Sequence, residues 1–514
     1  MNAPLKVIFK YLTMYLILLI ALLCLLVSWL YIKWIQMKNY WTNLGIPQGP
    51  VNPIFGSMSF LQKKNPNIWL NELYQKHKSR YVGIWVFWRR GLVINCPDLA
   101  RQILVKNADV FRNRNLGSGK LRDPMGALNL FTVDDPLWSS VRRRLTHVFT
   151  GSKLRGWHEL YHSKVTDLVY RINSDIEKGI TTNLRPLFAD YATDIIGESS
   201  FGIQCQATRN NTGPLREMTK EFEKYSTWRG LAWSSIFFLP EVVDLFGFSF
   251  WPKNSVEYFK RVFKMVVEER GGYDRVMDGK RDLLDALLKM KQDAIKDNQD
   301  MNLDVLISNA MIFLQGGYDT SSAGLTFIIY ELAYSPENQQ KLYEELLEAK
   351  HNLGGKEFDA SSLAELPFLD AVIKETLRKY PTMGWMDRLA NAEYQVDEHL
   401  TIPAGTVVYV NAVGMQRDPQ FFPDPEEFRP ERFLPENAND IVPYSYMPFG
   451  EGPRMCIGKR IAQSTMRYAL AAVILNFEVR PLPKQPIPNE IPIETKGLFY
   501  LPGVPLYVEF KPRN

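Results

Sequence analysis

Hydrophobic residues recur at intervals of three and four along much of the chain, which is the spacing of helices with one buried face. This spacing predicts helices at residues 98–106, 137–149, 154–178, 256–269, 283–296, 335–350 and 361–380. Short alternating or continuous apolar runs predict strands at residues 81–88, 91–94, 393–396, 407–411 and 506–510. The chain is therefore expected to be mostly α with a small β region.

One segment, residues 303–334, is apolar on almost every side. A helix without a polar face is typical of a protein core, so this segment is expected to be a long central helix. The residues Gly316-Gly317-Tyr318-Asp319-Thr320 interrupt the apolar pattern. An acid beside an alcohol is costly in apolar surroundings. Asp319 and Thr320 are therefore candidate catalytic residues, with a helix-bending hydroxyl cluster as the structural alternative.

The N-terminal region contains an uncharged apolar run at residues 11–32, bounded by Lys10 and Lys33. About 20 apolar residues suffice for a helix to span a membrane. No small-residue cleavage site follows the run, which favours a retained anchor over a signal peptide. Lysines flank both ends in similar number, so flanking charge leaves the orientation of the anchor open.

A segment rich in proline and glycine follows the anchor and predicts a stiff hinge, because proline fixes φ and removes a backbone donor. No later stretch resembles a linker. The expected division is a short flank at residues 1–10, a transmembrane anchor at residues 11–32, a hinge at residues 33–53 and one catalytic domain at residues 54–514.

Composition and charge narrow the possible partners. The chain has 514 residues, a net charge of +5 and no long basic run, so nucleic acid is not an expected partner. A mild positive charge is compatible with an acidic protein partner or an anionic membrane. The four cysteines are far apart in the sequence and do not resemble a disulfide framework.

Only Cys456 has a distinctive neighbourhood, the sequence F-G-E-G-P-R-M-C-I-G at residues 449–458. Glycines permit a tight turn, which a thiolate needs if it is to approach the iron of a flat haem ring. The predicted helix at residues 458–476 would place its N-terminus beside the sulfur and favour the thiolate form. Cys456 is therefore the candidate metal ligand, and Arg454 and Phe449 are candidates to contact a propionate and to shield the sulfur.

At this point the sequence resembles the cytochrome P450 family over about residues 40–514. The family pattern F-x-x-G-x-R-x-C-x-G is matched in full, including Gly458. The resemblance implies haem b held between a long central helix and the cysteine loop. It also implies that Trp138, Arg142 and Arg388 bind haem propionates, together with Arg454.

Further family motifs occur in the expected order. The resemblance implies that Glu375, Arg378 and Arg432 form a buried ion triad that supports the cysteine loop. It also implies that Asp319 and Thr320 relay protons during oxygen activation. The sequence of residues 145–154 is most similar to that of microsomal, xenobiotic-metabolising members, notably those of insects.

The function that the resemblance implies is a monooxygenase. It would insert one oxygen atom from O2 into a lipophilic small molecule, a xenobiotic or an endogenous lipid or hormone. The electrons would come from NADPH through a separate flavoprotein reductase, and cytochrome b5 is a further candidate partner. A membrane-lipid partner and a cytosolic catalytic domain at the endoplasmic reticulum are expected.

Two alternatives remain open. Within the same fold, a haem-thiolate isomerase or dehydratase would use no O2, although the Asp319-Thr320 pair favours oxygen chemistry. From a different class, His158-Glu159-x-x-His162 matches H-E-x-x-H, which binds zinc in metalloproteases. A solvent-facing helix explains that motif equally well.

Other segments are candidates for contact with substrate or partners. Apolar stretches at residues 125–131, 311–320, 382–386 and 497–501 are expected to line a substrate pocket. The aromatic stretch at residues 233–251 is either a membrane-dipping segment or ordinary core. A basic docking face for the reductase is expected from Arg143, Arg144, Lys153, Arg155, Lys459 and Arg460.

Overall fold

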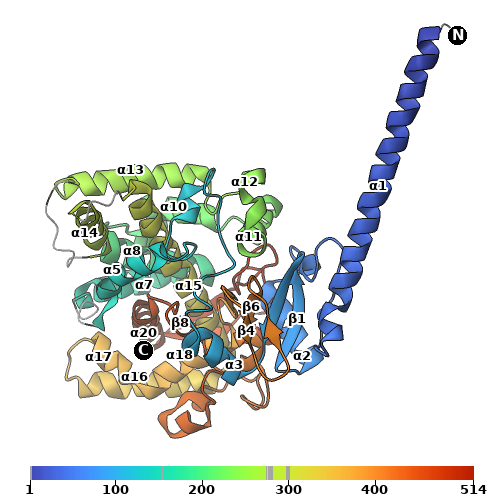
Figure 1. Cartoon of the computed structure of the whole chain (residues 1–514). Coiled ribbons are helices and arrows are strands. Elements are labelled where there is room, and N and C mark those ends of the chain that lie inside the picture. Colours follow the sequence, from blue (N-terminus) through green and yellow to red (C-terminus); the bar gives the residue numbers. More distant parts are fainter. Residues whose placement is uncertain (1–2, 152–155, 274, 276–281, 297–300, 514) are drawn as a thin grey trace.

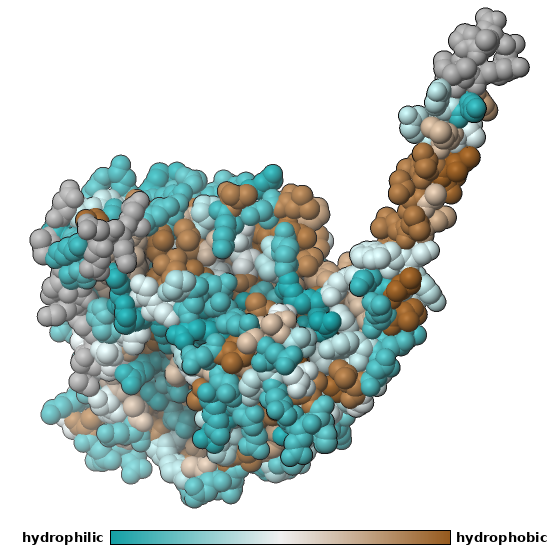
Figure 2. Space-filling view, viewed as in Figure 1, coloured by the Kyte–Doolittle hydropathy of each residue, from teal (hydrophilic) through white to brown (hydrophobic). Residues whose placement is uncertain are grey.

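The computed structural model describes residues 3–151, 156–273, 275, 282–296 and 301–513. Its first element is a long helix, α1 (Ala3–Asn43), which projects away from the rest of the protein (Figure 1). Among the described residues, one helix is long and apolar enough to cross a membrane, and it lies within α1. Figure 2 shows apolar surface over the middle of the projecting part of this helix.

The predicted hinge at residues 33–53 is wrong at its N-terminal end, because residues 33–43 continue α1 without a break. This stretch contains no proline or glycine, so nothing in it stops the helix. The helix ends before Gly45, which has a φ of +70°. Trp41 is fully buried, and its indole N–H donates to the Ile84 carbonyl at 3.1 Å. The C-terminal end of α1 is therefore packed against the catalytic domain.

The main sheet has four strands in the order β1-β2-β6-β3. Its strands are β1 (Tyr81–Val86), β2 (Arg89–Ile94), β6 (Val407–Val410) and β3 (Met386–Leu389). Strand β6 pairs in parallel with β2 and antiparallel with β3. Two smaller sheets pair β4 (Tyr394–Gln395) with β5 (Thr401–Ile402) and β7 (Phe477–Pro481) with β8 (Val508–Pro512). All five predicted strands are present within a few residues, whereas β3, β5 and β7 were not predicted.

The core is organised around α15 (Leu303–Tyr334). Its first half belongs to one large hydrophobic cluster and its second half to another. The expected long central helix is confirmed, and it is continuous through residues 316–320, where the apolar pattern is interrupted. Helix α8 (Leu184–Phe201), which was not predicted, lies along α15. A Cβ at Gly317 would lie 2.7 Å from Ile196, so this glycine permits the close approach of the two helices.

The remaining helices surround α15 and the sheets (Figure 1). In the first half of the chain they are η1 (Met58–Phe60), α2 (Pro66–His77), α3 (Pro97–Arg101), η2 (Gln102–Lys106), α4 (Pro124–Ala127), α5 (Leu137–Leu145), η3 (Thr146–Phe149), α7 (His158–Glu177), α9 (Ala207–Asn210), α10 (Pro214–Phe222), α11 (Thr227–Phe238), η4 (Pro240–Val242) and α12 (Val243–Phe246). In the second half they are α13 (Lys253–Glu269), α14 (Leu283–Lys296), α16 (Pro336–Asn352), α17 (Ala360–Ala364), α18 (Pro367–Lys379), α19 (Ala412–Gln416), η5 (Pro430–Phe433), η6 (Pro435–Asp440), α20 (Lys459–Asn476) and η7 (Pro488–Glu490).

The predicted helices are confirmed, with one notable difference. The segment at residues 361–380 forms two helices, α17 and α18, because Pro367 lacks the N–H needed to continue a helix and instead starts a new one. The start of the predicted helix 154–178 lies partly outside the described residues, and α7 is described from His158. The mostly α architecture with small β sheets agrees with the expected fold class.

Candidate active site

The cysteine loop turns at two glycines with left-handed backbone, Gly450 (φ +69°) and Gly452 (φ +75°). A Cβ at Gly452 would lie 1.9 Å from the Leu104 carbonyl oxygen, so no other residue fits without moving the backbone. The Cys456 N–H donates to the Phe449 carbonyl at 2.8 Å and closes the loop. Gly458 differs from the expectation, because its φ of −88° is open to any residue. Its nearest neighbour is the Cys456 sulfur, so it leaves space beside the ligand instead of making the turn.

Cys456 lies just before α20, as expected for a thiol near a helix N-terminus. Burial raises the pKa of the Cys456 thiol above its ordinary value. The Gly458 N–H and the positive charges of Arg142 and Lys459 act in the opposite direction, but burial has the larger effect. The side chain is nevertheless exposed, so the sulfur is open to a ligand. Metal binding would stabilise the thiolate, because a coordinating thiol loses its proton.

Four arginines gather near Cys456: Arg114, Arg142, Arg388 and Arg454. Burial lowers the pKa of each guanidinium, and the Arg114 charge lowers the pKa of the other three further. The Nε and Nη1 atoms of Arg114 are shielded from solvent and have no hydrogen-bond partner among the described residues. Asp387 and Asp134 lie near these arginines and offset part of the positive charge. The unused donors of Arg114 still suit a further anion, and the two propionates of a haem have the matching charge.

Arg114 is a residue that the sequence did not reveal. It lies in a segment without regular structure before α5, and no motif spacing marks it. Its environment becomes visible only in three dimensions, where its guanidinium lies over the Phe131 ring at 4.4 Å. The structure therefore adds Arg114 to the predicted anion-binding residues.

Arg454 ties the cysteine loop to the segment before α5. Its Nε donates to the Arg112 carbonyl at 2.9 Å and its Nη1 to the Val133 carbonyl at 3.1 Å. The guanidinium also lies over the Trp138 ring, 4.2 Å from its centroid. Trp138 and Arg142 share one face of α5, as their spacing predicts. Arg454 thus fixes the loop in addition to its predicted role toward a propionate.

The predicted ion triad is confirmed and fully buried. Arg378 donates to both Glu375 oxygens at 2.7 and 2.9 Å, and the Arg432 Nε donates to Glu375 at 3.3 Å. Gln416 connects the triad to the cysteine loop. Its amide donates to the Arg378 carbonyl at 3.0 Å, and its carbonyl accepts from the Met447 N–H at 3.1 Å. A change in the triad is therefore transmitted directly to the backbone that precedes Cys456.

On α15, the acid and the alcohol have different surroundings. The Thr320 hydroxyl donates to the Gly316 carbonyl at 2.6 Å, and a Cβ at Gly316 would meet no atom within 4 Å. Asp319 is buried and pairs with Arg185 of α8, which also donates to the Asp319 carbonyl at 2.9 Å. Burial raises the pKa of Asp319 in spite of this ion pair. The open space at Gly316 and Thr320 suits a small molecule, whereas Asp319 is held toward α8.

Arg185 is a second residue of the site that the sequence analysis missed, although its position in the sequence could have indicated it. It is a lone arginine near the start of a helix whose remaining residues are mostly buried. A buried cation usually has an anionic partner, so Arg185 could have been matched to Asp319, the acid in the middle of residues 303–334.

The H-E-x-x-H motif lies on α7 and does not form a zinc site. The His158 Nδ1 is 3.3 Å from the Tyr468 hydroxyl, and the His162 Nε2 is 2.8 Å from the Phe358 carbonyl. No group of three metal-ligating side chains occurs within the part of the chain that the structure describes. The two histidines therefore serve helix packing.

The segments predicted to line a substrate pocket converge in one hydrophobic cluster. Leu130, Phe313, Trp385 and Leu498 represent the four segments in it. In the stretch at residues 233–251 most aromatic side chains are buried, as expected for core, whereas Leu245 and Phe246 are 71% and 56% exposed. The buried aromatic residues of the stretch belong to this cluster, whereas Leu245 and Phe246 face outward.

The fold and the cysteine loop define a haem-thiolate protein, and comparisons with known proteins agree. The sequence matches the cytochrome P450 family over residues 47–510. It is 29% identical to cytochrome P450 6k1 of Blattella germanica, over 95% of this chain and 96% of that protein. It is 32% identical to cytochrome P450 3A28 of Bos taurus, over 94% of each chain.

The chain belongs to the cytochrome P450 family. It is an oxidoreductase of the monooxygenase class with haem as its cofactor. The expected similarity to insect members is confirmed and extends to mammalian members.

Proposed function

We propose that this protein oxidises lipophilic small molecules at a haem ligated by Cys456, using electrons from NADPH delivered by a flavoprotein reductase. The observation that carries the proposal is a cluster of four arginines, in which the half-buried Arg114 and Arg142 lie near Cys456, the buried Arg388 and Arg454 lie near Arg114, and Arg114 has unused donors. When bound, thiolate-ligated haem supplies the iron that activates O2. The protein supplies the sulfur, the cations that hold the propionates and the apolar walls.

Proton handling falls to α15 in this proposal. The Thr320 hydroxyl borders the open space at Gly316, where its oxygen can accept a hydrogen bond, and it can donate there once its own bond to the Gly316 carbonyl opens. Asp319 must leave Arg185 before it can carry a proton, and its raised pKa favours uptake of that proton. This pair supports oxygen chemistry over an isomerase or dehydratase, which needs no proton supply to O2.

The proposed location is the endoplasmic reticulum membrane, with α1 as the anchor and the catalytic domain in the cytosol. A helix of this length and apolar character supports an anchor. Reductase docking is proposed at Arg143, Lys459 and Arg460. Arg144 does not fit that role, because it donates to the Met290 carbonyl at 3.2 Å. Lys153 and Arg155 lie outside the described residues.

The test of the ligand is the spectrum of the reduced carbon monoxide complex. Cys456→Ser is expected to abolish the thiolate-type absorption, because a neutral hydroxyl donates little charge to iron. Cys96→Ser makes the same change at the N-cap of α3 and is expected to keep the spectrum. A thiolate-type spectrum in Cys456→Ser would contradict the assignment.

The reaction class is tested with isotopically labelled O2, NADPH, a reductase and a panel of lipophilic compounds. A monooxygenase incorporates one labelled oxygen atom into its product, whereas an isomerase or dehydratase incorporates none. Thr320→Ala is expected to divert electrons to peroxide, and Thr320→Ser is expected to retain coupling because it keeps the hydroxyl. Equal coupling in the two variants would remove Thr320 from the relay.

A further inference from the structure

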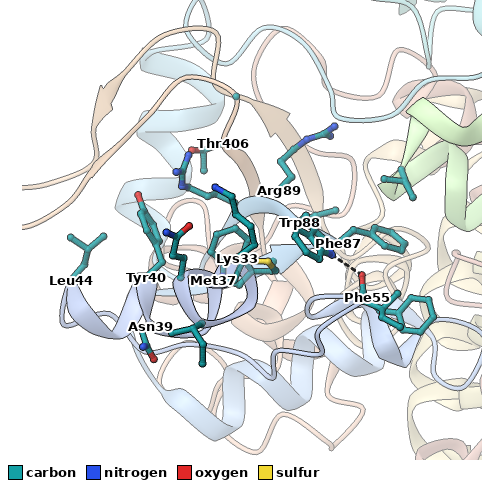
Figure 3. Close-up of a pocket in the computed structure, with 18 of the residues that line it drawn as sticks. Lys33, Met37, Asn39, Tyr40, Leu44, Phe55, Phe87, Trp88, Arg89 and Thr406 are labelled. Atoms are coloured by element: carbon teal, nitrogen blue, oxygen red, sulfur yellow. Dashed lines mark hydrogen bonds between the residues drawn. The ribbon is translucent and has the colours of Figure 1, made fainter. Parts of the chain in front are cut away.

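A large open groove lies where α1 meets the catalytic domain (Figure 3). Its walls are the last turns of α1, the loop at residues 54–55, the β1–β2 hairpin and the loop at residues 404–406. Its volume is about 1370 Å³. This exceeds the roughly 300–1,000 Å³ of pockets that take drug-sized ligands. None of the lining residues belongs to the cysteine loop, whereas Val86 and Phe87 also contact the substrate-side cluster.

The depth of the groove relative to a bilayer follows from two tryptophans. Trp29 lies inside the uncharged run of α1 and stacks on Trp88 at the hairpin tip, with 6.3 Å between ring centroids. Trp88 therefore sits at the depth of the apolar run, where tryptophan favours the membrane interface. The neighbouring Ile54 and Phe55 are 67% and 47% exposed. The rim of the groove formed by Ile54, Phe55 and Trp88 is thus apolar and reaches the bilayer surface.

Cations line the groove next to this rim. Lys33 is the first charge after the uncharged run, and Arg90 lies over the Tyr40 ring at 4.8 Å. Neither forms an ion pair with any residue that the structure describes, whereas Arg89 is paired with Glu241. Glu241 is the one acid among the lining residues. The groove therefore carries an uncompensated positive charge.

One polar group in the wall also has no partner. Trp85 lines the groove and is 5% exposed, and its indole N–H has no acceptor among the described residues. Buried donors of this kind nearly always have a partner. The Trp85 nitrogen itself is closed off from solvent, so a phosphate in the groove would contact the exposed cations Lys33 and Arg90 instead.

We propose that this groove binds one anionic phospholipid from the membrane that holds α1. The acyl chains cover the apolar rim at Ile54, Phe55 and Trp88, and the phosphate and acidic headgroup lie between Lys33 and Arg90. Charge complementarity favours an anionic lipid over a zwitterionic one. Continuity with the uncharged part of α1 favours a bilayer lipid over a soluble ligand.

The bound lipid has a structural consequence for the enzyme. The groove wall includes Leu239 and Glu241, which belong to the connection between α11 and α12. That connection lies within the aromatic stretch at residues 233–251, whose buried side chains belong to the substrate-side cluster. A lipid in the groove therefore contacts the anchor, the sheet and this connection together.

The test uses the full-length protein and native mass spectrometry with phosphatidylserine and phosphatidylcholine. One phosphatidylserine is expected to bind in preference to phosphatidylcholine. A surface cation contributes about 1 kcal/mol to attraction of anionic lipid, which corresponds to about fivefold in affinity. The double variant Lys33→Gln/Arg90→Gln is therefore expected to lower phosphatidylserine affinity roughly 25-fold and to lower phosphatidylcholine affinity less, so that the preference for phosphatidylserine is lost.

The matched control is Lys350→Gln/Lys356→Gln, which removes two exposed charges at the end of α16 and beyond it, on the side of the molecule away from α1 (Figure 1). It is expected to bind phosphatidylserine like the unaltered protein. Equal binding of both lipids by the unaltered protein would overturn the proposal, as would equal losses in the two double variants. Because Lys33 and Arg90 are exposed, thermal unfolding should be unchanged. The lipid readout does not depend on oxidation, so it separates this proposal from the proposed function.

Discussion

The cysteine loop and the middle of α15 both carry predicted site residues, yet they are built in opposite ways. The loop is held by an interlocked network of buried charges and backbone hydrogen bonds, from Glu375 through Gln416 to Met447. The middle of α15 instead leaves space, because Gly316 has no neighbour within 4 Å of where a Cβ would lie. A metal ligand needs one fixed geometry, whereas O2 and substrate need room to enter.

The energetic consequences differ in the same way. A buried ion triad depends on every partner, because removing one leaves uncompensated charges in an apolar interior. The packing of α15 against α8 depends instead on shape at Gly317. Mutations on the loop side should therefore cost more than mutations on the helix side.

The largest expected effect is that of Glu375→Gln. It removes the one carboxylate that pairs with Arg378 and Arg432 and is expected to destabilise the protein by about 3–5 kcal/mol. Chemical denaturation of the haem-loaded protein measures this change. Glu344→Gln on exposed α16 is the control and should change stability by less than about 0.5 kcal/mol. Equal effects would show that the triad does not stabilise the loop.

Arg114→Gln is expected to have an intermediate effect on stability, with opposite signs in the haem-free and the haem-loaded protein. Without haem, the change relieves repulsion among the four guanidinium groups and should raise stability. With haem, it removes a charged hydrogen bond of about 1.5–3 kcal/mol and should speed haem loss roughly 10- to 100-fold. Transfer of haem to a scavenger protein measures this rate, with exposed Arg143→Gln as control. Unchanged haem loss would exclude Arg114 from propionate binding.

The smallest effect comes from a matched pair on α15. Gly317→Ala places a Cβ 2.7 Å from Ile196 and is expected to cost about 1–3 kcal/mol. Gly316→Ala enters open space and should stabilise the helix by up to about 1 kcal/mol, because alanine is the better helix former. Thermal unfolding compares the two. If both variants lost stability equally, the space at Gly316 would not differ from the tight contact at Gly317.

Much of the fold could be predicted from local patterns. The bounds of α14 and α15 agree with those predicted from their hydrophobic pattern, because the pattern of an amphipathic or fully apolar helix can be recognised in the sequence. Helix α8 was missed because it is buried on nearly all sides and contains polar residues such as Asp190 and Asp194, which obscure its periodicity. Strand β3 was missed because four residues carry too little pattern.

The sequence by itself predicted Cys456 as the metal ligand and the glycine turn before it, because both depend on residue types at short spacing, and the family resemblance implied the ion triad. Only the tertiary structure decided which charges meet. Arg114 joins Arg388 and Arg454 across segments far apart in the chain, and Arg185 reaches Asp319 from another helix. Pairwise electrostatics depends on distance in space, and local sequence patterns do not encode that distance. The groove beside α1 arises for the same reason, from the way in which an anchor helix packs against a sheet.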